Sequence, residues 1–119
     1  MNTERLYVVT LWAPDVDSAA HFYRDVLGLA MLPNHGHRPH FKVGLTLLVI
    51  MRSEGPISQT GQSERFPCLA LEVEDLDAAL EQLNDHKVDL PWGIEEDGDS
   101  RWVMFHDPAG NLIELAELV

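Results

Sequence analysis

Two segments that lie half a chain apart share the same order of apolar and polar positions. They are VVTLWAPDVDSAAHFY, starting at Val8, and CLALEVEDLDAALEQL, starting at Cys68, which gives an offset of 60 residues. Each begins with a short apolar run, passes through an acidic turn and continues with apolar residues at helical spacing. Four of the sixteen positions are identical. The pattern predicts a strand, turn and helix that occur twice.

The apolar residues behind each acidic turn predict two helices. They follow the i, i+3, i+4, i+7 spacing of a helix that buries one face, in the first copy at Ala19, Phe22, Tyr23, Val26 and Leu27, and in the second at Leu76, Ala79, Leu80 and Leu83. Either Asp15 or Asp17 suits the N-terminal cap of the first helix, and Gly28 suits its end. Either Asp75 or Asp77 suits the cap of the second.

Runs typical of strands follow each helix. In the first half, RPHFKVG and LTLLVIM meet at Gly44 as a hairpin, and in the second, SRWVMF and LIELAEL flank the turn DPAGN. A shorter run, LAMLP or VDLPW, precedes each hairpin. Each half therefore reads as strand, helix and three strands, which predicts an α+β fold. The polar segment 53–64 reads as a linker between module one, about residues 1–52, and module two, about 65–119.

Composition narrows the classes of partner. A chain of 119 residues with 45% hydrophobic residues suits one domain with a real core. The formal net charge of −12 argues against nucleic acid and anionic membranes as partners. The single cysteine excludes an intrachain disulfide and suits the cytoplasm. Neither a signal peptide nor a membrane helix is visible. A small-molecule partner is the remaining expectation.

Glu114 lies where a carboxylate is not expected. On period two it shares a strand face with Leu112, Ala116 and Leu118. Burying a carboxylate costs several kcal/mol unless a cation, a metal or hydrogen-bond donors meet it. Glu114 is therefore the first candidate for a functional residue.

Three stretches resemble the vicinal oxygen chelate superfamily, which contains glyoxalase I, extradiol dioxygenases and bleomycin-resistance proteins. They are DVDSAAHFYRDVLGL, LALEVEDLDAAL and, most specifically, FHDPAGNLIEL. The resemblance implies two tandem βαβββ modules whose curled mixed sheets form a cleft, with helices on the outer faces. It also implies a homodimer, with modules paired within or between chains. The superfamily spans many chemistries, so the resemblance names no reaction.

The resemblance also implies a metal role for Glu114, because metal-dependent members carry a glutamate ligand after this turn. The other positions that carry metal ligands in those members hold different residues in this chain. Val8 and Cys68 take the places of the usual histidines, and LTLLVIM offers only the thioether of Met51. A catalytic divalent metal needs about three protein ligands. We therefore expect no metal cofactor, and the alternative is an altered site of Glu114 and Cys68. The favoured interpretation of Cys68 is a small buried hydrophobe.

Further residues are candidates for the cleft. Val8, Thr10 and Trp12 share one face of the first strand. In the run HGHRPH, we expect His35 and His37 to lie in a solvated loop. We expect His40 to begin a strand and to point its side chain into the cleft. His21 and His86 suit the surface, and His106 adjoins the turn. The predicted ligand-binding set is Glu114, Cys68, Val8, Trp12, His40 and Trp102.

Three classes of function remain open. The first is a metal-independent protein that binds or sequesters an apolar or cationic small molecule. The second is a metal-dependent lyase, isomerase or dioxygenase with an altered ligand set around Glu114. The third is a metal-free enzyme in which Glu114 is the general base. The vacant ligand positions and the acidic charge favour the first class.

Overall fold

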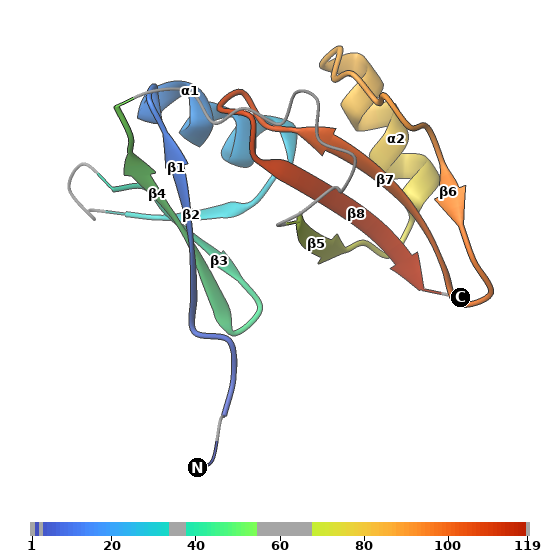
Figure 1. Ribbon diagram of the computed structural model, residues 1–119, viewed down its shortest axis with the longest axis horizontal. Coiled ribbons are helices and arrows are strands. Elements are labelled where there is room, and N and C mark those ends of the chain that lie inside the picture. The colour runs from blue at the N-terminus through green and yellow to red at the C-terminus, as the bar shows by residue number, and fades with distance from the viewer. Residues whose placement is uncertain (1, 3, 34–37, 55–67, 119) are drawn as a thin grey trace. The chain divides into compact units, whose positions relative to one another are not determined.

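The chain forms two compact units, Met1–Ile57 and Ser58–Val119 (Figure 1). The computed structural model describes residues 2, 4–33, 38–54 and 68–118. From residue 55 onward, the predicted linker lies outside these residues, as do His35 and His37. Each unit holds one four-stranded sheet and one helical segment.

The first unit has the predicted order of strand, helix and three strands. Its elements are β1 (Val8–Ala13), α1 (Val16–His21), which continues directly into the π-helical turn η1 (Phe22–Val26), β2 (Ala30–Leu32), β3 (His40–Val43) and β4 (Thr46–Arg52). The strand order is β1-β4-β3-β2. β1 runs parallel to β4, and the other pairs are antiparallel.

The second unit repeats this topology. Its elements are β5 (Cys68–Glu72), α2 (Leu76–Asp85), β6 (Glu95–Glu96), β7 (Ser100–His106) and β8 (Leu112–Leu118). The order is β5-β8-β7-β6, with β5 parallel to β8 and the remaining pairs antiparallel. The predicted α+β fold of two βαβββ modules is confirmed.

The structure decides between the alternative helix caps. The carboxylate of Asp15 accepts a hydrogen bond from the backbone N–H of Ser18 at 3.0 Å, and that of Asp75 accepts one from Ala78 at 3.2 Å. Each satisfies one of the N–H groups that a helix start leaves without an intrahelical partner. Gly28 follows the first helical segment with φ of +72°, as predicted.

One predicted strand is wrong. The run VDLPW forms no strand, and the short strand β6 lies instead at Glu95–Glu96, within the acidic segment that follows. Pro91 has no N–H to donate to a sheet, and the N–H of Gly93 bonds to the carbonyl of Leu90 at 3.1 Å, which closes a turn.

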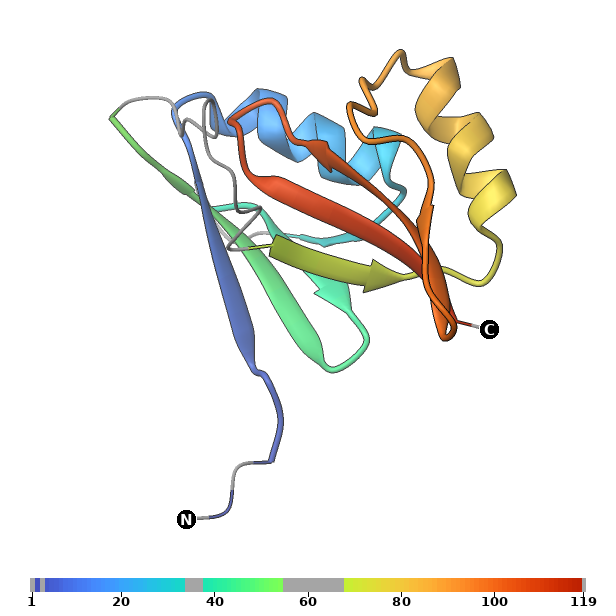
Figure 2. The ribbon, with the colours of Figure 1, turned by 45° about the vertical axis from the view of Figure 1, so that its right-hand side comes forward.

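In each module one sheet face is tightly covered. In the first, Phe41, Leu48 and Ile50 are at most 2% exposed, and the ring of Tyr23 from η1 lies 5.9 Å from that of Phe41. In the second, the buried residues on the equivalent face are Val103, Phe105 and Ile113. α1 contacts β4, and α2 contacts β8 (Figures 1 and 2). Since strand residues alternate between faces, their neighbours in sequence point to the opposite side.

Candidate functional site

Glu114 lies on the sheet face opposite Val103, Phe105 and Ile113. Its register partners are Ala70 on β5 and Met104 on β7, and directly paired residues present their side chains on the same face. Along β8, its neighbours on this face are Leu112 and Ala116. The half-buried Glu114 therefore has apolar side chains on all four sides. The sequence predicted the neighbours along β8, while the neighbours across the sheet required the register.

Two adjacent rows add polar groups to this face. Cys68 and His106 flank Leu112, while Glu72 and Trp102 flank Ala116. The structure thus brings the predicted residues Cys68 and Trp102 to the face of Glu114. Cys68 is exposed, so its interpretation as a buried hydrophobe is wrong. It is the first residue of an edge strand and points away from the covered face, where a helix would have buried it.

Trp102 leaves a hydrogen-bond donor unused. Its indole Nε1 is buried and has no hydrogen-bond partner among the described residues. A buried donor without an acceptor costs about 1–3 kcal/mol, so an acceptor on a ligand could recover this energy. Beside the row of Cys68, the ring of Trp92 lies 5.8 Å from that of His106. This aromatic contact was not predicted, because the two residues are far apart in sequence and only the fold brings them together.

A buried aspartate fixes the register of Glu114. Asp107, which is 4% exposed, begins the turn between β7 and β8. One carboxylate oxygen accepts bonds from the N–H groups of Ala109 at 3.0 Å and Asn111 at 2.8 Å, and the other accepts one from Asn111 Nδ2 at 2.9 Å. Gly110 adopts φ of +96°, which favours glycine. The turn length thereby sets Glu114 opposite Met104.

The guanidinium of Arg101, on the strand next to β8, is engaged on the other face of the sheet. Arg101 lies one residue before Trp102 and so points to the opposite face, where its guanidinium meets Glu117 at 2.9 Å and Asp77 at 3.5 Å. The hydrogen bond to Glu117 is the main reason that the pKa of Arg101 is raised. This network orders the other side of the sheet and leaves the face of Glu114 acidic.

The first module places its predicted site residues together as well. Val8, Thr10 and Trp12 share a face, and His40 joins them because it pairs with Val49, which also pairs with Thr10. Trp12 is 47% exposed, and Val8 and His40 are half-buried. His40 Nδ1 lies 2.6 Å from the carbonyl oxygen of Arg38.

Val49 occupies the position in this sheet that Glu114 occupies in the second. The first residue of β1, Val8, pairs with Leu47, and the first residue of β5, Cys68, pairs with Leu112. Two residues after Leu47 comes Val49, and two residues after Leu112 comes Glu114. Val49 is 6% exposed and offers no ligand atom. Within the described ranges, no group of three His, Cys, Asp or Glu side chains is placed to hold a metal ion. A divalent metal site requires about three such ligands.

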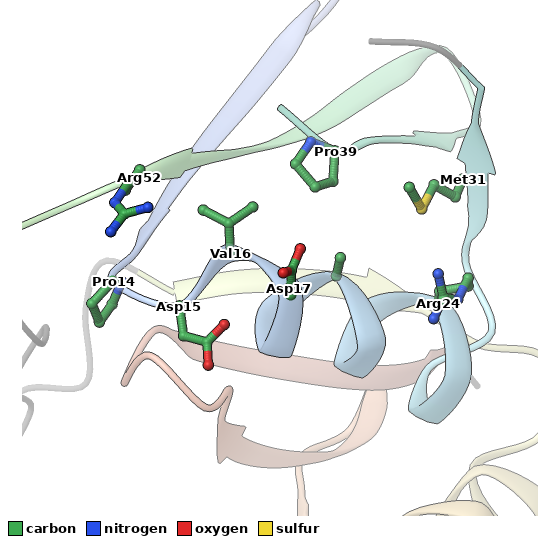
Figure 3. Close-up of a pocket in the computed structure, with 9 residues that line it drawn as sticks. Pro14, Asp15, Val16, Asp17, Arg24, Met31, Pro39 and Arg52 are labelled. Atoms are coloured by element: carbon green, nitrogen blue, oxygen red, sulfur yellow. The ribbon is translucent and has the colours of Figure 1, made fainter. Parts of the chain in front are cut away.

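A separate concave feature lies within the first module. It is a pocket of about 980 Å³ between α1 and the ends of the strands (Figure 3). None of the six predicted ligand-binding residues lines it. Its walls combine apolar side chains with Asp15, Asp17, Arg24 and Arg52.

With the fold and these faces described, the family follows. The sequence model of the Glyoxalase/Bleomycin resistance protein/Dioxygenase superfamily matches residues 5–115. The chain belongs to this superfamily, as the resemblance of its three stretches implied. No helix in the described part of the chain is long and apolar enough to cross a membrane.

Solved structures of diverse proteins are similar to this chain. Lactoylglutathione lyase from Agrobacterium tumefaciens is 24% identical over 98% of this chain and 95% of its own, with a TM-score of 0.76. TnmS3, an antibiotic binding protein from Streptomyces sp. CB03234, is 25% identical over 100% and 99%, with a TM-score of 0.77. A glyoxalase/dioxygenase from Nostoc punctiforme is 20% identical over 97% and 91%, with a TM-score of 0.81. The fold is therefore shared by enzymes and by a binding protein.

Proposed function

We propose that this protein binds a small apolar cation, without a metal, on the sheet face that carries Glu114. The observation that carries the proposal is the half-buried carboxylate of Glu114, which the register surrounds with Ala70, Met104, Leu112 and Ala116. An apolar surface with one charged group suits a ligand that has an apolar body and one opposite charge.

Charge favours a cationic ligand over a neutral or anionic one. The chain carries a formal net charge of −12, which attracts cations over long range and repels anions. The low polarity around Glu114 strengthens its attraction for a cation that displaces water. The aromatic ring of Trp102 on the same face adds a surface that suits cations. TnmS3, which is similar in fold, is an antibiotic binding protein, and this supports a binding role.

The chemistry of the donors argues for binding without metal. Glu114 alone matches the ligand pattern that the resemblance implies, while Val8 and Val49 cannot bind a metal ion. Cys68 and His106 lie in the adjacent row, yet they do not gather with Glu114 into a metal-binding group. A single carboxylate anchors a cationic organic group, but it does not hold a catalytic divalent ion.

The first test combines metal analysis with ligand binding. Protein purified without chelators is analysed for bound metal, and a library of cationic and neutral apolar compounds is screened by thermal shift. We expect less than stoichiometric metal, and we expect stabilisation by cationic members. Glu114→Gln should weaken the binding of those compounds by roughly 1–3 kcal/mol, the scale of a charged hydrogen bond. The melting temperature of the ligand-free variant should be equal to that of the wild-type protein or higher.

A matched variant separates the site from the overall charge. Glu81→Gln removes the same charge from an exposed position on α2 and should leave binding unchanged. If both variants weakened ligand binding equally, the loss of affinity would come from long-range attraction by the net charge, and this would contradict the proposal. About one metal ion per chain, lost in Glu114→Gln, would favour the metal-dependent enzyme instead, and Cys68→Ser would be the next variant. If the protein converted a bound compound without metal, and Glu114→Gln abolished this activity, the result would favour the metal-free enzyme with Glu114 as general base.

A further inference from the structure

The pocket in the first module has a chemistry of its own. At about 980 Å³ its volume is at the upper end of the range of about 300–1,000 Å³ typical of small-molecule sites. Val16 and Ala20 line it from the helix, Met31 from β2, and Pro39 from the segment before β3. Figure 3 shows the side chains of Val16, Met31 and Pro39 around this space. These residues offer an apolar surface to part of a ligand.

Two of the four charged side chains in the lining are already engaged. The guanidinium of Arg24 donates two hydrogen bonds to the carboxylate of Asp25, at 2.8 and 3.0 Å, and these raise the pKa of Arg24. The carboxylate of Asp15 caps α1 through the N–H of Ser18. Neither charge is the first choice for a ligand, since binding would compete with an existing partner.

The other two charges are available. Arg52 and Asp17 are exposed, and neither forms a hydrogen bond or an ion pair with any residue in the described ranges. They come from opposite sides, Arg52 from the end of β4 and Asp17 from the first turn of α1 (Figure 3). The pocket therefore offers one cation, one anion and an apolar surface between elements of a single module.

This combination selects one class of ligand. An anion would use Arg52 but would be repelled by Asp17 and by the net charge of −12. A cation would use Asp17 and be repelled by Arg52. A zwitterion satisfies both side chains and carries no net charge. We propose that the pocket binds an apolar α-amino acid, with its carboxylate on Arg52, its ammonium group on Asp17, and its side chain against Val16, Met31 and Pro39.

Four related compounds test this assignment. They are L-phenylalanine, its N-acetyl derivative, which is an anion, its amide, which is a cation, and N-acetyl-phenylalaninamide, which is neutral. Binding is followed by two-dimensional amide NMR of the full chain. We expect the free amino acid to shift resonances of residues around the pocket. Removing either ligand charge should weaken binding by about tenfold, the effect of losing a charged hydrogen bond.

Variants assign each ligand charge to one side chain. Arg52→Gln should weaken the binding of L-phenylalanine about tenfold but should not weaken the binding of the amide, because the amide has no carboxylate for Arg52 to hold and is relieved of its repulsion. Asp17→Asn should weaken the binding of L-phenylalanine likewise but should not weaken the binding of the N-acetyl derivative, which is relieved of its repulsion by Asp17. Lys42→Gln and Asp85→Asn, which remove matched charges from exposed positions elsewhere, should have no effect. The same spectra report whether each variant is folded.

Three outcomes would overturn the assignment: no shifts at millimolar L-phenylalanine, equal binding of N-acetyl-phenylalaninamide, or equal affinity in wild type and Arg52→Gln. Glu114→Gln should leave amino-acid binding unchanged, because Glu114 does not line this pocket. The result is therefore independent of the function proposed for the Glu114 face.

Discussion

Asp107 shows how one residue positions another seven places away. Its carboxylate holds three N–H donors of the turn, and the turn length places Glu114 beside Met104 rather than on the covered face. A slip of one residue would exchange the two faces of β8 and bury the carboxylate among Val103 and Phe105. The role of Asp107 is therefore to position Glu114, although Asp107 itself lies outside the proposed binding face.

Asp107→Ala should lower the free energy of unfolding by about 2–3 kcal/mol, because buried N–H groups lose a charged acceptor. Asp107→Asn, which keeps one carbonyl acceptor, should cost less. Urea unfolding of both variants measures the difference. Equal stability of wild type and Asp107→Ala would show that solvent satisfies these donors and that the carboxylate does not fix the turn.

Glu114 could be singled out from the sequence as a candidate residue, but its surroundings were predictable only in part. The period of β8 gives Leu112 and Ala116 from sequence alone. Ala70 and Met104 come from strands far away in the chain, and only the register of the sheet makes them neighbours. The exposure of Cys68 was mispredicted for a related reason. Residue type predicts average burial, whereas the edge position of β5 decides it here.

At the scale of elements, repeated patterns were predicted well and the irregular connection was not. The apolar spacing in both helices and the apolar runs of β4, β7 and β8 each extend over several residues, so no single side chain decides them. The run VDLPW is short, it contains Pro91, which has no N–H to donate to a sheet, and it ends in a turn closed by Leu90 and Gly93. The strand that replaces it, β6, contains two glutamates and has no apolar pattern by which it could be recognised.

The carboxylate of Asp97 holds the turn between β6 and β7. The carboxylate of Asp97 accepts hydrogen bonds from the N–H groups of Asp99 at 2.8 Å and Ser100 at 2.9 Å, and these lower its pKa below the ordinary 3.8. A carboxyl group whose pKa is lower in the folded than in the unfolded chain stabilises the fold above its ordinary pKa. This stabilisation is lost as the pH falls through the folded value.

Asp97→Asn should therefore be less stable than wild type at neutral pH, and the difference should shrink below pH 3.8. Denaturant unfolding across this range gives the comparison. Asp99→Asn, which removes a neighbouring charge whose side chain forms none of these bonds, is the control. A difference that stays constant with pH would mean that the loss comes from hydrogen-bond geometry and not from the charge.

At the scale of the whole molecule, three exposed apolar side chains gather near the start of β1 and the turn between β3 and β4. Leu6, Tyr7 and Leu45 are between 60% and 73% exposed. They lie close together, since Arg5 stacks on Tyr7 at 5.1 Å and donates a hydrogen bond to the carbonyl of Leu45. Exposed apolar clusters of this kind are typical of interaction sites in soluble proteins.

We predict a homodimer, as the resemblance implied. Light scattering at micromolar concentration should report twice the chain mass of 13.4 kDa. Leu45→Glu, in the turn between β3 and β4, should shift the population toward the single chain if this patch is part of the interface. A single species of 13.4 kDa in the wild-type protein would refute the prediction.

The two modules have the same topology, but only the second carries a carboxylate at this position, and under the proposed function this difference predicts the stoichiometry of binding. Val49 occupies the position in the first module that Glu114 occupies in the second. The second module therefore carries a carboxylate at this position, and the first carries an isopropyl group. A chain built from two equal halves would offer two equivalent places and titrate in a two-to-one ratio. Here saturation should come at one cation per polypeptide, and exchanging the halves at this position, through Val49→Glu with Glu114→Val, would move the anchor without adding a second.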